Sequence, residues 1–195
     1  IFCHTDFIYN LFSDLKNIKT LKNVTLLTNQ TDDMITKKLF FKKPKCISNW
    51  YSINVSIDSD RVTAIPLGLS NNYSPKNLRS EDYINLNSNI KNLPITMYVN
   101  FRITNFKERE VLYEQFHSYD WAKINKPNIS LGSYITDLNT STFTLAPWGN
   151  GVDTHRIWEA IYAGSIPITK YHRTFKGMKN LPILFVNDYK EITYE

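Results

Sequence analysis

Residues 141–169 read STFTLAPWGNGVDTHRIWEAIYAGSIPIT, and the fold of the whole chain is inferred outward from this stretch. It begins with an apolar and β-branched run over residues 143–146, which is typical of a buried strand. Pro147, Gly149 and Gly151 then interrupt the run and predict a loop whose backbone can approach a ligand closely.

A helix is predicted after this loop, over about residues 155–163. Asp153 or Thr154 suits its N-cap, and Gly164 suits its end. A second strand begins at residues 166–168, so the stretch predicts a strand–loop–helix–strand unit of a parallel sheet. The helix N-terminus carries unpaired N–H groups and a positive dipole end, a combination that attracts phosphate.

Three polar residues stand at helical spacing in this unit. His155 and Glu159 are four apart and Arg156 and Glu159 are three apart, so their side chains can meet on one helix face. One interpretation of Arg156 and Glu159 is a surface ion pair that contributes less than about 1 kcal/mol. We favour a ligand site, because the carboxyl edge of an open α/β sheet is where ligands bind.

The composition indicates a folded α/β protein with a mildly basic balance. The 195 residues are 42% hydrophobic and 14% aromatic, which is ample for a core. The formal net charge of +5 suits a phosphate-bearing partner without requiring nucleic acid. One lysine cluster is expected to be a solvated face: Lys37, Lys38, Lys42, Lys43 and Lys45.

Cysteine usage and hydropathy are less informative. Cys3 and Cys46 have no metal-ligand spacing and are expected to be unpaired thiols. No apolar run reaches the roughly 18 residues that a membrane helix needs. Two locations stay open: the cytoplasm if the chain is complete, and a membrane-anchored lumenal position if an N-terminal segment has been removed.

Strands alternate with polar loops and helices along the chain, which predicts parallel sheets with their loops on one edge. Expected strands cover residues 1–3, 24–27, 46–51, 61–65, 95–99 and 181–186. Expected helices cover residues 7–15, 33–40, 107–118, 130–138 and 188–195. The predicted domains are an N-terminal unit over 1–70, a linker or excursion over 71–92, and a C-terminal unit over 93–195.

Several motifs together resemble exostosin-like glycosyltransferases. The main one is FTLAPWGNGVDTHRIWEA with the following AGSIPI, and it is joined by IPLGL at residues 65–69, NFRITNFKER at 100–109 and LPILFVND at 181–188. The resemblance is strong over residues 95–188 and loose over residues 1–70.

The resemblance implies a GT-B architecture, in which two Rossmann-like parallel-sheet units face a cleft. It implies transfer of a sugar from a nucleotide-sugar, which we expect to be a UDP-sugar, to a glycan acceptor without an essential metal or other cofactor. The N-terminal unit looks short of a full Rossmann-like domain, so part of the acceptor side is expected to be missing.

A metal-free enzyme of this kind must neutralise the leaving diphosphate with cations and helix-terminal N–H groups. Arg156 matches the HR-x-W-E motif of the family and is the first choice for the diphosphate, and Glu159 is expected to accept from the ribose hydroxyls. The remaining expected donor-binding residues are Arg102, Asn105, Arg109, Gly149, Asn150, Gly151, Asp153 and His155. Two of them have alternative roles. Arg109 could be only a charged residue on a helix surface, and Asp153 could be only the N-cap of the helix. Tyr134 or Trp148 is expected to border the base.

A general base for the acceptor hydroxyl requires a carboxylate or histidine near the acceptor. Asp6 and Asp32 follow N-terminal strands in polar loops and are the candidates, although loop aspartates more often cap helices.

Two further functions stay open. A non-catalytic module that binds a nucleotide-sugar or a glycan would show the same C-terminal motif. A glycosyltransferase that modifies DNA would suit the basic balance, but no stripe of basic residues with interleaved aromatics is visible, so a nucleic-acid partner is not expected.

Overall fold

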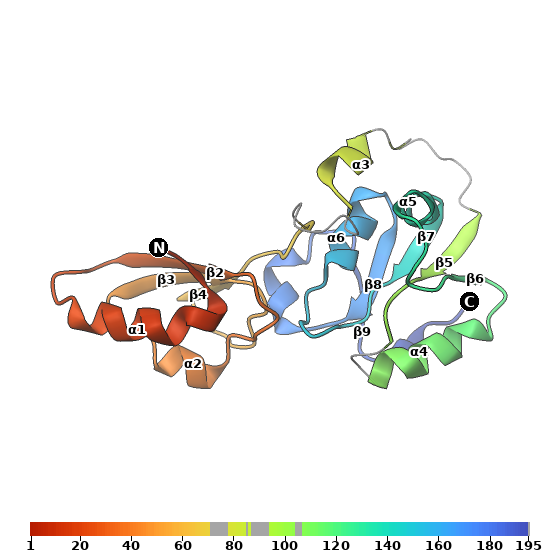
Figure 1. The fold of residues 1–195 in the computed structure, drawn as a ribbon. Coiled ribbons are helices and arrows are strands. Elements are labelled where there is room, and N and C mark those ends of the chain that lie inside the picture. The colour runs from red at the N-terminus through yellow and green to blue at the C-terminus, as the bar shows by residue number, and fades with distance from the viewer. Residues whose placement is uncertain (71–77, 85, 87–93, 104–106, 195) are drawn as a thin grey trace. The chain divides into compact units, whose positions relative to one another are not determined.

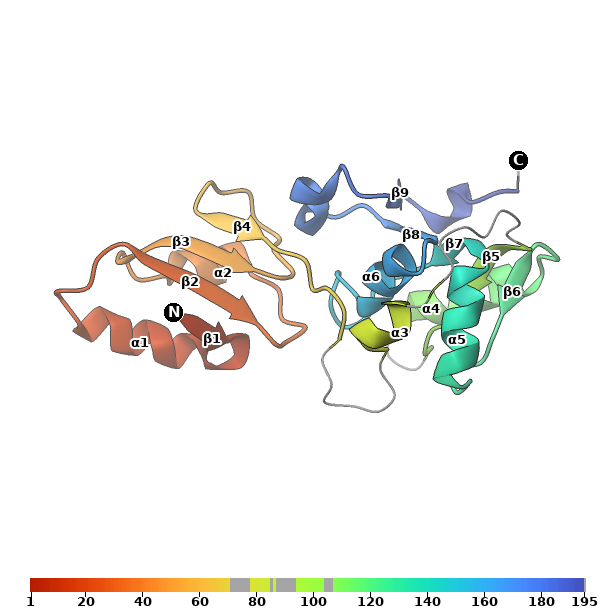
Figure 2. The same cartoon turned by 90° about the horizontal axis from the view of Figure 1, so that it is seen from above.

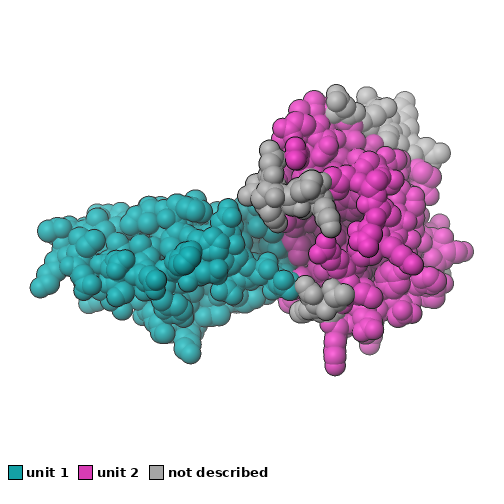
Figure 3. Space-filling view, in the orientation of Figure 1, with its two compact units in different colours: residues 1–67, 150–153, 172–179 teal, residues 68–149, 154–171, 180–195 magenta. Residues whose placement is uncertain are grey.

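The computed structural model describes residues 1–70, 78–84, 86, 94–103 and 107–194. The chain forms two compact units (Figure 3). Unit 1 comprises residues 1–67, 150–153 and 172–179, and unit 2 comprises residues 68–149, 154–171 and 180–195.

Unit 1 is built on a four-stranded parallel sheet in the order β1-β2-β3-β4 (Figures 1 and 2). Its strands are β1 (Phe2–His4), β2 (Val24–Asn29), β3 (Ile47–Ser52) and β4 (Val62–Ala64). Its helices are η1 (Thr5–Phe7), α1 (Ile8–Asn17), α2 (Lys37–Phe41) and η2 (Arg173–Met178).

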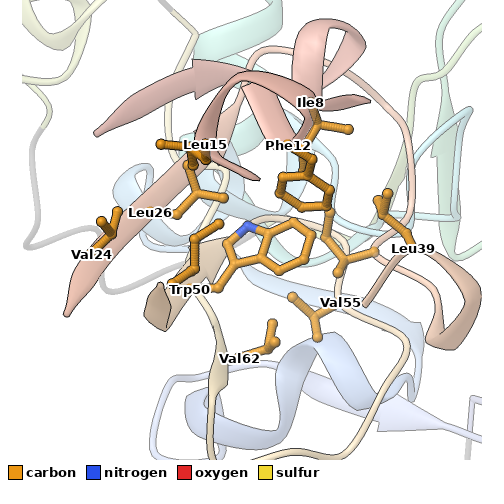
Figure 4. Close-up of a cluster of buried hydrophobic side chains, with 11 residues drawn as sticks. Ile8, Phe12, Leu15, Val24, Leu26, Leu39, Trp50, Val55 and Val62 are labelled. Carbon is orange, nitrogen blue, oxygen red and sulfur yellow. The ribbon is translucent and has the colours of Figure 1, made fainter. Parts of the chain in front are cut away.

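Trp50 lies at the centre of the core of unit 1 (Figure 4). Its ring meets Phe12 of α1 edge to face, with 5.7 Å between ring centroids. Its Nε1 donates to Thr28 Oγ1 at 2.8 Å, and that hydroxyl donates to Ser52 Oγ at 2.8 Å. The buried polar atoms of this core therefore satisfy one another.

The other face of this sheet is exposed in the described residues. Side chains alternate between the two faces along a strand, and the register places Phe2 opposite Leu27 and Leu27 opposite Tyr51. All three side chains are exposed, so they form an apolar row across β1, β2 and β3.

Two segments from far along the sequence complete unit 1. Asn54, at a left-handed φ of 52°, accepts at Oδ1 from the N–H groups of Val152 (3.1 Å) and Asp153 (3.0 Å). Thr174 of η2 donates to the carbonyl of Val55 at 3.1 Å. Residues 150–153 and 172–179 are thus bound to the loop after β3.

Unit 2 contains a five-stranded parallel sheet in the order β6-β5-β7-β8-β9. Its strands are β5 (Ile95–Val99), β6 (Ala122–Ile124), β7 (Ser141–Leu145), β8 (Ile166–Lys170) and β9 (Leu184–Val186). Its helices are α3 (Ser80–Ile84), α4 (Lys107–His117), α5 (Leu131–Asn139), α6 (His155–Tyr162) and η3 (Tyr189–Glu191).

Both faces of this sheet are covered. Met97 belongs to a buried cluster with Phe116 of α4, whereas its neighbour Tyr98 belongs to a second cluster with Leu138 of α5 and Ala160 of α6. Adjacent strand residues thus face helices on opposite sides, as expected for a parallel sheet.

The predicted α/β class with two parallel-sheet units is confirmed. The strand over 95–99 has the predicted bounds, and Gly164 follows α6 at a φ of +82°. Two predicted helices were wrong in extent. The helix predicted at 33–40 begins only at Lys37, because Thr36 accepts from Leu39 N as its N-cap. In place of the helix predicted at 188–195, the described residues 188–194 contain the 3-10 turn η3, closed by an Asp188–Glu191 capping box.

The sequence interpretation did not include β6 or η2, both of which are short. Most of the stretch expected as a linker, 71–92, lies outside the described residues.

Trp50→Phe is expected to lower the free energy of unfolding by about 1–3 kcal/mol, because Thr28 Oγ1 loses its buried donor and a void remains. Urea denaturation followed by circular dichroism measures this change. Tyr51→Phe at the exposed neighbouring position is the control and should change the free energy by less than about 0.5 kcal/mol. Equal costs at the two positions would contradict the packing described.

His172 should make the stability depend on pH. Its Nδ1 accepts from Thr174 N (3.1 Å) at the start of η2, and burial together with the charge of Arg173 lowers the pKa of the imidazole below 6.5. The unfolded chain therefore binds this proton first as pH falls, so the stabilisation is complete above about pH 6.5 and is lost as pH falls through the folded-state pKa.

His172→Asn retains a capping acceptor that does not titrate. The fall in melting temperature between about pH 7 and 5 should be smaller in this variant than in the wild type. An unchanged slope would mean that His172 has the same pKa in both states.

Candidate functional site

The candidate site lies in unit 2, where the loops after β5 and β7 meet the start of α6. Parallel strands end at the same edge of a sheet, so the loop after β5, with Phe101, and the loop after β7, with Gly149, are neighbours there. Arg156 reaches this edge from α6 and Arg109 reaches it from α4.

Arg109 connects the two loops. Its guanidinium is buried and donates to three backbone carbonyls: Nε to Trp148 (2.8 Å), Nη2 to Pro147 (3.1 Å) and Nη1 to Arg102 (3.1 Å). Burial, and then the nearby charge of Arg156, lowers the pKa of Arg109 to about 10, so the group remains a cation at pH 7. In this structure it positions the loops, which explains its burial better than the helix-surface alternative.

Arg156 is the second cation of the site. Its Cζ lies 6.0 Å from the centroid of the Phe101 ring, and Arg109 Cζ lies 5.7 Å from the same centroid. Arg156 Nε is buried and has no hydrogen-bond partner in the described part of the chain. No ion pair to either guanidinium occurs among the described residues.

Glu159 does not neutralise Arg156. The two side chains, both within the described range 107–194, form no ion pair, so the surface-pair interpretation is wrong. Instead Glu159 Oε2 accepts from the hydroxyl of Tyr134 at 2.7 Å. Burial and the charge of Glu159 hold the pKa of Tyr134 well above 10, so the hydroxyl stays protonated and fixes the carboxylate.

The N-terminus of α6 adds polar groups. Its N-cap is Thr154, not Asp153, and the Thr154 side chain makes no capping hydrogen bond. Thr154 Oγ1 is buried and unpaired among the residues that the structure describes. His155 Nδ1 lies 2.8 Å from the carbonyl oxygen of Gly68, which fixes the imidazole. The first-turn N–H groups of a helix lack intrahelical partners, and together these groups suit an anion.

The predicted glycine loop divides between the two units. Gly149 belongs to unit 2. A Cβ atom at this position would lie only 2.8 Å from Arg109 Nη2. Asn150, Gly151 and Asp153 belong to unit 1. Asn150 is exposed, Gly151 lies against Asn54, and the buried Asp153 accepts from Leu67 N at 2.7 Å.

The other predicted residues lie elsewhere. Arg102 is exposed, and Asn105 lies outside the described residues. Asp6 and Asp32 are exposed in unit 1, and Asp6 lies 3.5 Å from His4 Nδ1. Neither aspartate caps a helix, because the N-caps of η1, α1 and α2 are His4, Phe7 and Thr36.

Sequence reasoning missed Phe101 and Asn54. Phe101 lies in the loop that directly follows β5. Its position at the carboxyl end of a strand was the sequence feature that could have marked it as a site residue. Asn54 gave no comparable signal, because its partners at 152 and 153 are nearly a hundred positions away.

An open polar surface pocket of about 470 Å³ lies beside α5. Lys123 and Asn125 both donate to the buried carboxylate of Asp137 at its wall. Tyr134, which holds Glu159, projects from the same helix. Trp148 is half-buried, and its Nε1 donates to the carbonyl of Lys170 at 3.3 Å.

Comparison with known proteins found a similarity over residues 100–194. Residues 100–194 match the family model of the RXYLT1 C-terminal domain, which is xylosyltransferase-like and of exostosin type. This part of the chain is therefore similar to a glycosyltransferase-like family, and it contains Arg109, Arg156 and Glu159. A search of curated proteins found no match.

Two further observations hold for the described residues. No helix there has the length and apolar character that crossing a bilayer requires. No cluster of three or more His, Cys, Asp or Glu side chains there is arranged to hold a metal ion.

Gly149→Ala is expected to lower the free energy of unfolding by about 1–3 kcal/mol, because the new Cβ would displace the Arg109 guanidinium from its carbonyls. Thermal and urea unfolding measure the effect. Gly132→Ala is the matched control: the nearest atom to its Cβ is 4.0 Å away and it lies in α5, so alanine should stabilise by about 0.5–1 kcal/mol. Equal effects of the two substitutions would contradict the proposed contact at Gly149.

Proposed function

We propose that unit 2 binds a nucleoside-diphosphate sugar, in the first instance a UDP-sugar, and that the protein transfers the sugar to a glycan acceptor without a metal. One observation carries the proposal. Arg156 presents a guanidinium beside a second guanidinium at the start of α6, and its buried Nε has no hydrogen-bond partner among the residues that the structure describes. The similarity of residues 100–194 to a glycosyltransferase-like family supports a diphosphate as the anion.

In this proposal Arg156 and the first-turn N–H groups of α6 bind the diphosphate. Negative charge grows on the leaving diphosphate as the glycosidic bond breaks, so fixed cations and N–H donors stabilise the transition state more than the ground state. Arg109 adds its positive charge to the site while its N–H groups remain hydrogen-bonded to the three loop carbonyls. The site therefore supplies positive charge that a metal would otherwise supply.

Glu159 is proposed to accept from the ribose hydroxyls. Its Oε2 already accepts from Tyr134, so the tyrosine sets the orientation of the carboxylate and its other oxygen accepts from the ligand. The open polar surface pocket beside α5 is the proposed place for the base, because its volume of about 470 Å³ falls in the range of small-molecule sites. Asp6 and Asp32 remain the proposed general bases.

Calorimetric titration of UDP, GDP and CMP in the presence of EDTA tests the donor site. The wild type should bind one nucleoside diphosphate, and Arg156→Ala should weaken that binding by about 10–100-fold, the equivalent of one charge-assisted hydrogen bond. Arg79→Ala, an exposed arginine of unit 2, is the matched control and should bind as the wild type does.

Each contrary result has a distinct meaning. Unchanged affinity in Arg156→Ala would refute the assigned diphosphate site. Binding that requires added Mg²⁺ would refute metal independence alone. Tight binding without sugar transfer to any glycan acceptor would identify a binding module instead of an enzyme.

A further inference from the structure

The positive charge of the chain is concentrated in nine residues of unit 1. Residues 37–45 read KKLFFKKPK, with five lysines and no acidic residue. The formal net charge of the whole chain is +5, so acidic and basic residues balance over all other positions. Residues 37–45 thus carry a local charge of +5 at α2 and the turn that follows it.

Aromatic side chains are exposed among these lysines, so the expectation that the chain has no basic stretch with interleaved aromatics was wrong. Phe41 is 72% exposed, and Tyr9 of the neighbouring α1 is 52% exposed. Lys37 Nζ lies 5.8 Å from the centroid of the Phe41 ring, and Lys42 Nζ lies 4.7 Å from that of Tyr9. We call these side chains, with Lys38 and Lys45, the lysine–aromatic surface.

This surface is fixed to the core of unit 1. Leu39 of α2 is buried in the same cluster as Phe12 and Trp50 (Figure 4), and Thr36 caps the helix. Lys43 donates to the carbonyl of Ile47, and burial lowers its pKa, so it belongs to the scaffold. Four lysines and two aromatic rings are thus held outward together, which a simple solvated lysine face does not explain.

We propose that the lysine–aromatic surface binds the surface of an anionic lipid bilayer. Clusters of four to eight basic residues attract anionic headgroups, and an exposed phenylalanine gains by entering the boundary between headgroups and acyl chains. Aromatic side chains inserted at that depth leave the neighbouring ammonium groups level with the phosphates.

The ring geometry favours lipid over single-stranded nucleic acid. Bases bind such proteins by stacking on the faces of aromatic rings. Here lysine ammonium groups lie over Phe41, Tyr9 and Phe40, the last at 5.8 Å from Lys43 Nζ, so a base would compete with a cation for these ring faces. Insertion of a ring edge into lipid meets no such competition.

Flotation of the full 195-residue chain with lipid vesicles tests the proposal. Vesicles of phosphatidylcholine with about 30% phosphatidylserine should bind the protein, and pure phosphatidylcholine should not. Lys38→Glu/Lys42→Glu should weaken binding by at least about 25-fold, about fivefold for each lysine. Phe41→Ser should weaken it by about tenfold or more, while its exposure predicts an unchanged melting temperature.

Lys179→Glu/Lys190→Glu makes the same change in net charge at exposed lysines outside the surface and is the control. It should bind vesicles within about twofold of the wild type. The proposal is overturned if the wild type ignores anionic vesicles, or if this control loses as much affinity as Lys38→Glu/Lys42→Glu. Tighter binding to single-stranded DNA or to an anionic polysaccharide at the same salt also overturns it. Nucleotide titrations of the same variants should match the wild type, which separates this test from that of the donor site.

Discussion

A buried arginine that has no carboxylate partner in the described part of the chain is the constraint on which unit 2 depends. Arg109 places its charge among backbone carbonyls, three of which accept from it. Burying a cation is costly unless its donors are satisfied, and here the loops after β5 and β7 provide the acceptors only when they lie side by side. The guanidinium of Arg109 is therefore solvated only when the two loops are ordered side by side. The absence of a side chain at Gly149 leaves room for that guanidinium.

This arrangement also determines the charge of the candidate site. Carbonyl oxygens solvate Arg109 but carry no formal charge, so they do not cancel its field. The carboxylate of Glu159, three positions after Arg156 on α6, accepts from the hydroxyl of Tyr134 instead. Two guanidiniums thus lie over the Phe101 ring with no ion-pair partner in the described residues, and burial, followed by the charge of Arg156, lowers the pKa of Arg109. An arriving anion would relieve a repulsion that folding has already imposed.

The sequence predicted the features that depend on residues close together in the chain. The alternation of strand and helix patterns was sufficient for the fold class, and β5 was predicted to the residue because a short apolar run stands between polar loops. The motif around α6 identified Arg156 and Glu159 through helical spacing. The partners of Arg109, by contrast, are carbonyls up to 39 positions away, and no residue type marks a carbonyl that will accept. Asn54 was missed because its partners are also distant in the sequence, and the start of α2 was placed too early because Thr36, inside the predicted range, is the N-cap.

The composition of unit 1 has a consequence for biosynthesis. Its first 67 residues leave the ribosome early, but Asn54 and Val55 find their partners only when residues 150–153 and 172–179 have been made. At about 5–20 residues per second, roughly 100 intervening residues keep the nascent N-terminal sheet waiting for some 5–20 seconds. During that interval the apolar row of Phe2, Leu27 and Tyr51 is exposed. The loop after β3 also lacks the hydrogen-bond partners that it has in the folded protein. The growing chain is thus an expected client of chaperones that bind emerging hydrophobic segments.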